Sequence, residues 1–395
     1  MLFISLLFFG SLYFLQGAVL AFIINFQKPF LSAQGVSREQ IALLTSSMLF
    51  PFIGKIFLGA LSDRVSWGRW GRRKPYIVLG LGLSGVSYLA LGFVDPAPQF
   101  KLYFFLSVLA TLGLALFDTT ADGMAIDKTQ ETDQGLVQAA MLAGKSLGLI
   151  LFSFLFGAVV QDYGVRFTFW TLSVLTIPIV IACLFYSAPD RSDDQMVIAE
   201  MEPPARPLVS AFFWLFALYG VVYSITSFGV DGIMTLFMDQ DLHLPARDLG
   251  MFGSLRGVGS LIGALLAGAT LRKFKKGQIA YFSLVLLALA AYANSMMTAN
   301  AYWMWALAWG LAWGVQETTF VTLAMALSIG RWSATMFALL MMFSNIGTSG
   351  GEAIATTLSA HYAIPLVLKG LALWLLPVAG VLALYLRSAP KDLVD

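Results

Sequence analysis

The sequence predicts an all-α membrane protein whose twelve transmembrane helices form two pseudo-symmetric bundles of six. Three observations lead to this fold class. The composition is 58% hydrophobic and 12% charged over 395 residues, which is typical of a chain whose solvent is lipid. Apolar runs of about 20 residues, the length that crosses a bilayer as a helix, follow one another along the chain. A polar, acidic and proline-containing segment at 188–208 divides these runs into two sets.

The predicted helices are taken in order from the apolar runs and from the residues that interrupt them. Ser37 to Gln40 has the pattern of a capping box and opens the second helix, and Asp95 to Pro98 ends the third. The first six spans are 3–27, 39–61, 75–94, 101–126, 136–160 and 167–187, and the second six are 209–236, 248–271, 278–298, 301–328, 333–359 and 365–387. The predicted domains are an N-terminal bundle at 1–187, a cytoplasmic linker at 188–208 and a C-terminal bundle at 209–395.

A short basic stretch joins the second and third predicted helices. It holds one acid, Asp63, and a run of bases: Arg64, Arg69, Arg72, Arg73 and Lys74. Short loops this rich in lysine and arginine stay on the cytoplasmic side of a membrane. Most other bases outside the predicted helices fall on the same side, together with the linker and both chain ends. We therefore expect a multi-pass inner-membrane protein with both termini in the cytoplasm.

Charged residues inside the predicted helices are the first candidates for function, because each costs about 2.5–3.5 kcal/mol to insert at mid-membrane. Asp118 and Lys145 lie at similar distances from the turn between the fourth and fifth helices, so they lie at similar depth. Asp231 and Arg256 match in the same way across the next such hairpin. Each set is either a structural ion pair or part of a substrate or proton site. Lys55 and Lys369 are the other bases in predicted spans.

Two further patterns place carboxylates on one helix face. Asp118 and Asp122 are one turn apart, an arrangement that suits a proton carrier unless Asp122 is hydrated from the cytoplasm. On the tenth helix the row Trp305, Trp309 and Trp313 continues to Glu317, beside Gln316. Such a row suits the wall of a cavity for a partly apolar or sugar-like solute. The alternative is that its outer tryptophans anchor the helix at the membrane interface.

The basic loop also carries a family resemblance. Gly59-x-x-x-Asp63-Arg64, followed by Gly71-Arg72-Arg73, resembles the loop 2–3 signature of the major facilitator superfamily of secondary transporters. The pattern returns in weakened form as Gly268-x-x-x-Arg272, as expected for an internal repeat. This resemblance implies the major facilitator fold and a gating role for Lys55, Gly59, Asp63, Arg64, Arg72 and Arg73 at the cytoplasmic face.

Within the superfamily, three segments look like the AmpG-type permeases, a branch that includes muropeptide, acetyl-CoA and siderophore transporters. They are Lys55 with Asp63-Arg64, the series Asp118-x3-Asp122-x4-Asp127, and the segment at 333–340. The chain lacks the Trp-Ser-Pro that this branch usually has between the lysine and the aspartate. The end of the basic loop, Gly71 to Tyr76, also resembles glycoside–cation symporters.

These patterns predict a secondary active transporter that moves a small or medium-sized solute by alternating access, in symport with protons. The solute is expected to be muropeptide-, siderophore- or sugar-like. The candidate substrate and proton site is Asp118, Asp122, Lys145, Asp231, Arg256, Trp309, Trp313, Gln316 and Glu317. The alternatives are a sugar–cation symporter and a non-transporting assembly factor for pigment–protein complexes.

Several classes are not expected. The sequence shows no P-loop, dinucleotide fingerprint or metal-ligand spacing, and its single cysteine, Cys183, gives no disulfide framework. We therefore predict no cofactor, no metal, no enzyme activity and no nucleic-acid partner. The expected partners are the solute, protons and the lipid bilayer, and the expected state is a monomer.

Overall fold

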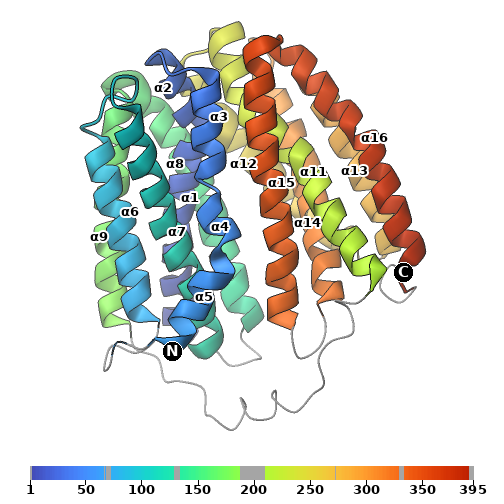
Figure 1. The fold of residues 1–395 in the computed structure, drawn as a ribbon, viewed down its shortest axis with the longest axis horizontal. Helices are drawn as coiled ribbons and strands as arrows, with labels where there is room; N and C mark the ends of the chain where they lie inside the picture. The colour runs from blue at the N-terminus through green and yellow to red at the C-terminus, as the bar shows by residue number, and fades with distance from the viewer. Residues whose placement is uncertain are drawn as a thin grey trace. The chain divides into compact units, whose positions relative to one another are not determined.

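The computed structural model describes residues 2–65, 67, 73–128, 134–186, 210–271, 273–328 and 333–390. Regular secondary structure within these ranges is helical throughout, as Figure 1 shows. The chain divides into two compact units. Unit 1 is Met1–Met196 with Pro245–Ser254, and unit 2 is Val197–Leu244 with Leu255–Asp395. The predicted linker at 188–208 lies outside the described residues.

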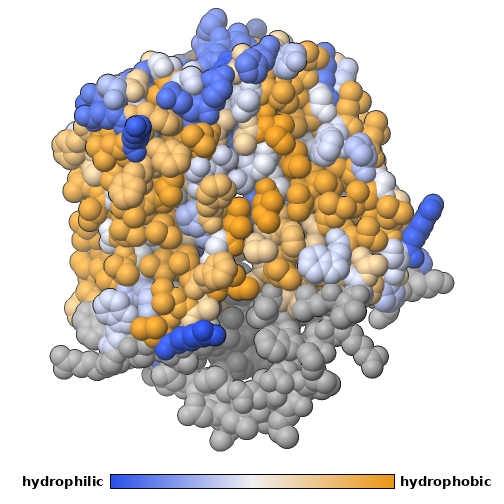
Figure 2. Space-filling view, viewed as in Figure 1, coloured by the Kyte–Doolittle hydropathy of each residue, from blue (hydrophilic) through white to orange (hydrophobic). Residues whose placement is uncertain are grey.

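The described helices have the length and surface of a membrane protein. Ten segments are long and apolar enough to span a bilayer. Two further long helices, α14 (Tyr302–Leu327) and α15 (Ser333–His361), occupy the predicted tenth and eleventh positions. They are not among the ten, so the total of twelve stays a prediction. Figure 2 shows hydrophobic residues along the sides of the helices and hydrophilic residues gathered at one end. This apolar surface is suited to lipid tails.

Unit 1 is built around two long helix pairs. Its helices are α1 (Leu2–Asn25), α2 (Gln27–Ala33), α3 (Arg38–Ser47), α4 (Phe50–Ile53), α5 (Lys55–Arg64), α6 (Lys74–Leu91), α7 (Phe100–Lys128), α8 (Gln134–Tyr163) and α9 (Val165–Phe185). α1 packs along α8, and α6 along α7. Gly17, Gly144 and Gly148 put the backbones of α1 and α8 in direct contact, because a Cβ at any of them would overlap a backbone atom of the facing helix.

The predicted helix at 39–61 is present as a span but not as one helix. It begins as expected, with a capping box between Ser37 and Gln40. It then breaks into α3, α4 and α5 because Pro51 has no N–H to donate to the carbonyl four residues earlier. The helix tightens around the break, where the amide of Leu49 donates to the carbonyl of Ser46 at 3.2 Å. A second interruption falls at Gly54, so Lys55 is the first residue of α5.

Unit 2 repeats the close parallel packing of α1 on α8. Its helices are α11 (Ala211–Leu236), a π-helical turn at Phe237–Asp241, α12 (Ala246–Thr270), α13 (Lys276–Asn294), α14, α15 and α16 (Ile364–Ser388). The first part of α12 belongs to unit 1 and the rest to unit 2. α11 packs along α15, where Gly347 and Gly351 lie against the α11 backbone. These close contacts determine which face of α11 lies against α15.

Candidate functional site

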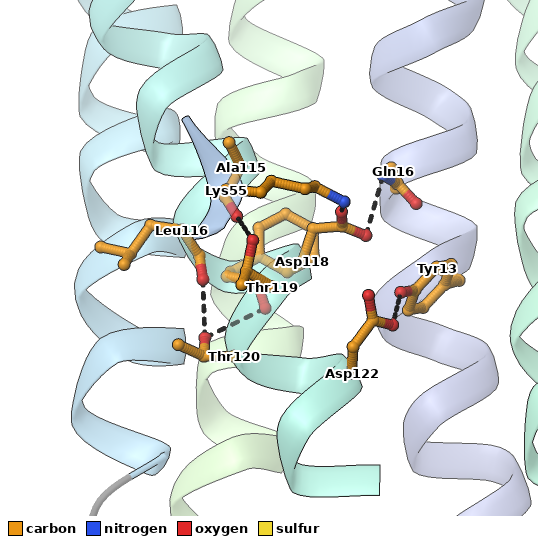
Figure 3. A network of polar contacts seen from close by, with 10 residues as sticks. Tyr13, Gln16, Lys55, Ala115, Leu116, Asp118, Thr119, Thr120 and Asp122 are labelled. Atoms are coloured by element: carbon orange, nitrogen blue, oxygen red, sulfur yellow. Dashed lines mark hydrogen bonds and ion pairs between the residues drawn. The ribbon is translucent and has the colours of Figure 1, made fainter. Parts of the chain in front are cut away.

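A polar network joins three helices inside unit 1, as Figure 3 shows. Lys55 at the start of α5 forms an ion pair with Asp118 on α7. Gln16 on α1 donates from Nε2 to Asp118 Oδ1 at 3.1 Å. One helical turn further along α7, the hydroxyl of Tyr13 on α1 donates to Asp122. Both predicted carboxylates therefore face α1, and each has a neutral donor there.

The two members of the unit 1 ion pair differ in exposure. The side chain of Asp118 is 3% exposed, whereas that of Lys55 is 33% exposed. The Lys55 ammonium also lies 5.5 Å from the centre of the Phe52 ring, within the range of a cation–π contact. The lysine is therefore the more exposed member of the pair.

The depth argument placed Lys145 level with Asp118 as one possible partner, and the structure shows which lysine pairs with it directly. The direct ion pair is with Lys55, and Lys145 on α8 contributes its positive charge to both Asp118 and Asp122. Matching depth is necessary for contact but does not determine which helix faces meet. Asp118 thus lies between two lysines from different helices.

The threonines beside Asp118 do not enter the network. Thr119 and Thr120 donate to the carbonyls of Ala115 and Leu116, each at 2.7 Å, within α7 itself (Figure 3). Their hydroxyls are thereby satisfied by their own helix, as is common for threonine in apolar helices. This leaves the two carboxylates as the groups of this α7 segment that contact α1 and α5.

The second predicted ion pair, in unit 2, is confirmed. Arg256 on α12 pairs with Asp231 on α11, and their side chains are only 10% and 8% exposed. The indole Nε1 of Trp309 on α14 donates to the other carboxylate oxygen of Asp231 at 3.1 Å. Asp231 is therefore held by a cation on one oxygen and a neutral donor on the other.

Glu317 and Gln316, both on α14, have different surroundings. The hydroxyl of Tyr223 on α11 donates to Glu317 at 2.7 Å. Gln316 is buried, accepts from Ser283 at 2.7 Å and donates to Tyr219 at 2.7 Å. Gln316 thus ties three helices together, whereas Glu317 is half-buried.

The tryptophan row on α14 is not uniform. Trp309 is fully buried and its indole N–H is bonded to Asp231. Trp305 and Trp313 are half-buried, and among the described residues their indole N–H groups have no hydrogen-bond partner. The predicted cavity-lining role of the row therefore concerns Trp313 more than Trp309.

Of the predicted gating residues, Lys55 begins α5 and pairs with Asp118, Gly59 and Arg64 lie further along α5, and Arg73 precedes α6. A Cβ at Gly59 would lie 3.5 Å from the Thr119 methyl group, so this glycine lets α5 approach α7. Arg73 donates to Ser62 at 2.8 Å, and its guanidinium packs where a side chain at Gly123 would stand. Arg64 is exposed at the end of α5. The side chain of Asp63, and Arg72 entirely, lie outside the described residues.

Five contributors to these networks were not predicted from the sequence: Tyr13, Gln16, Tyr219, Tyr223 and Ser283. Each is a neutral polar residue within an apolar helix. Charge and depth give no information about such residues. A usable signal would have been Tyr13 and Gln16 at a three-residue spacing, which places both on one helix face.

Comparison with known proteins agrees with this architecture. The sequence model of the Major Facilitator Superfamily matches residues 2–352, and the chain belongs to this superfamily of membrane transporters. It is similar to the anhydromuropeptide permease of Escherichia coli (strain K12), with 24% identity over 317 residues. That alignment covers 75% of this chain and 62% of the permease, which is less than two thirds of its length.

Solved structures show the same fold. A bacterial homologue of the human lysosomal transporter Spinster, in an inward-facing and occupied conformation, superposes with a TM-score of 0.77 at 15% identity, covering 99% of this chain and 97% of that one. A point mutant of the nucleoside transporter NupG also gives 0.77, at 11% identity and with 96% and 99% coverage. The predicted fold class and family are thereby confirmed.

Proposed function

We propose that the protein is a proton-coupled secondary transporter that moves a small or medium-sized solute across the inner membrane by alternating access. The observation that carries this proposal is the network of Lys55, Asp118, Asp122 and Lys145 within membrane-spanning helices. Buried ionisable groups in a membrane are expensive, and they commonly mark ion or substrate pathways. The solute class is muropeptide-, siderophore- or sugar-like, and the first of these agrees with the Escherichia coli relative, an anhydromuropeptide permease.

In this proposal the two units have different roles. Asp118 and Asp122 exchange protons, with Lys55 and Lys145 as counter-charges. Glu317 and Trp313 contribute to the solute site, while Asp231, Arg256, Trp309 and Gln316 hold that part of unit 2 in place. The bundles at 1–187 and 209–395 rock about the midplane, with both termini and the linker in the cytoplasm and the protein acting as a monomer.

The main test uses purified protein in proteoliposomes loaded with a pH-sensitive dye. A thermal-shift screen first selects the compounds that stabilise the protein, from muropeptides, siderophores, disaccharides and acyl-CoA compounds. Each selected compound is then added outside the proteoliposomes. We expect one of these classes to drive proton entry, and we expect Asp118→Asn to abolish it. Lys369→Gln is the matched control, because Lys369 is a half-buried membrane lysine on α16 outside both networks.

The same assay separates the alternatives. Proton or cation entry driven by a disaccharide alone would favour the sugar–cation symporter, which the sequence at 71–76 resembles. Absence of flux with every compound would favour a non-transporting assembly factor.

The gate proposal concerns the cytoplasmic end of α5. Asp63, with Arg64, Arg72 and Arg73, would latch this face through its negative charge. Asp63→Asn removes the charge with little change in shape. Unimpaired uptake by cells carrying this variant would remove the latch from the proposal.

A further inference from the structure

The break in the second transmembrane span determines where Lys55 lies. Pro51 and Gly54 interrupt the helix, and α5 begins at Lys55 in the middle of the span at 38–62. Interrupted spans are a recurrent feature of transporter sites, because they put a helix end at membrane depth. Here the helix end and the lysine ammonium occupy the same place.

The start of α5 favours negative charge for two reasons. Its N-cap is Gly54, and among the described residues no side chain caps it. The first N–H groups of a helix carry partial positive charge. The Lys55 ammonium lies 5.5 Å from the ring of Phe52, a residue of the short helix just before this end. An acidic group that reaches Lys55 therefore meets a full positive charge beside a favourable helix end.

Access to the ion pair is one-sided. The Lys55 side chain is 33% exposed, whereas Asp118 is 3% exposed and also accepts from Gln16. The lysine is therefore the more exposed of the two charged side chains. Asp118 remains hydrogen-bonded to α1 if the lysine turns away from it.

The formal charges of Asp118 and of the three charged residues around it cancel. Lys55 comes from α5, Lys145 from α8 and Asp122 from α7, while α1 contributes the neutral Gln16 and Tyr13. Two lysines and two aspartates have formal charges that cancel. An added anion makes the cluster negative by one, and one proton on a carboxylate restores neutrality. A carboxylate that loses its counter-charge in a poorly hydrated place binds a proton more readily.

We propose that Lys55 is the receptor for a carboxylate of the transported solute. The solute carboxylate displaces Asp118 from the Lys55 ammonium, and Asp118 then takes one proton from a hydronium ion. One O–H bond of the hydronium ion breaks, one O–H bond forms on the Asp118 carboxylate, and a water molecule is released. One anionic group and one proton enter the site together, so the charge of the cluster is the same empty and loaded. This inference rests on the proposed function and specifies its solute as an acid.

The first experiment measures binding to the purified full-length protein. The probe is the anhydromuramyl disaccharide, which carries a single carboxylate, compared with its methyl ester. A hydrogen bond to a charged group corresponds to roughly a tenfold to hundredfold change in affinity. We therefore expect the ester to bind at least about tenfold more weakly to the wild type and to Lys369→Gln. In Lys55→Gln the acid and ester should bind alike, and Lys55→Arg should restore the preference.

The outcomes distinguish this inference from the proposed function. Equal binding of acid and ester to the wild type, or a preference that survives in Lys55→Gln, overturns the carboxylate receptor and leaves the transporter in place. If neither form binds, the same acid–ester comparison is made with the siderophores and acyl-CoA compounds. Binding by neutral disaccharides alone then overturns the inference, and binding by no compound counts against the proposed function as well.

The second experiment measures charge movement in proteoliposomes with the same disaccharide. Because one negative charge and one proton move together, uptake should follow a pH gradient and should be unchanged by a potassium diffusion potential set with valinomycin. Uptake that responds several-fold to the potential contradicts the one-for-one exchange at Asp118. Uptake without any proton movement contradicts the proton coupling in the proposed function.

Discussion

The ion pairs of unit 1 and unit 2 join the same kinds of charge but differ in how open they are. In unit 2, Arg256 and Asp231 are both about nine-tenths buried, and Trp309 occupies the second oxygen of the aspartate. In unit 1, Asp118 is buried but its lysine is one-third exposed. A closed pair of this kind stabilises one arrangement of helices, whereas an open pair can exchange partners. The comparison indicates that unit 2 holds its shape while unit 1 carries the exchangeable charge.

The largest effect is expected from breaking the closed pair. Arg256→Met leaves Asp231 buried without its cation, which should lower the free energy of unfolding by about 3–5 kcal/mol. Thermal and denaturant unfolding of the purified variant in detergent measures this loss. The double variant with Asp231→Asn should recover most of it, because no unpaired charge remains. If Arg256→Met alone were as stable as the wild type, the Arg256–Asp231 ion pair would not be closed in the folded protein.

The two tyrosine–carboxylate bonds provide a matched comparison between the units. Tyr13 donates to Asp122, and Tyr223 donates to Glu317. Replacing either tyrosine by phenylalanine should lower the free energy of unfolding by about 1–2 kcal/mol, because this is the range that a single hydrogen bond contributes to the stability of a membrane protein. Solute-driven proton entry should fall further in Tyr13→Phe than in Tyr223→Phe. The reverse order would assign the proton to unit 2.

Breaking the open pair should cost less stability than breaking the closed one. Lys55→Gln should lower the free energy of unfolding by about 1 kcal/mol, because Gln16 still donates to Asp118 and Lys145 still contributes charge. Proton-coupled uptake should nevertheless be lost. A stability loss as large as that of Arg256→Met, with unfolding followed in the same detergent, would contradict the distinction between open and closed pairs.

The smallest expected effect concerns the third group around Asp231. Trp309→Phe keeps most of the buried ring and removes the indole N–H that donates to the carboxylate. The expected loss is about 0.6 kcal/mol, the average for hydrogen bonds between membrane helices. Transport should be nearly unchanged, because Trp309 is fully buried. A large loss of solute binding in this variant would place Trp309 at the solute site after all.

Charge and depth predicted part of this arrangement from the sequence. Asp231 and Arg256 lie on consecutive helices at matching depth, and the structure pairs them. Matching depth also made Lys145 a possible partner of Asp118, whereas the ion pair is with Lys55 on a helix that is not adjacent to α7 in the chain. Rotation of each helix about its axis decides such contacts, and it depends on packing that a single sequence does not reveal.

The interruption at 48–54 was missed for a related reason. Hydropathy detects a span by its average composition, and the segment at 38–62 has the average of a continuous helix. Pro51 and Gly54 were visible in the sequence, but in membranes such residues are often accommodated within a helix. Likewise, Tyr13 and Gln16 gave no signal because neutral polar residues change hydropathy only slightly.

The glycine contacts between α1 and α8 have a consequence for motion. Backbone touches backbone at Gly17, Gly144 and Gly148, and a carbonyl that meets Gly17 is that of Lys145 itself. Two helices packed this closely move together as a rigid pair, so the backbones that carry Tyr13, Gln16 and Lys145 keep a constant spacing. The span that bears Lys55 is interrupted, whereas α1 and α8 are continuous helices. Lys55 can therefore change its position relative to a rigid helix pair within the same unit.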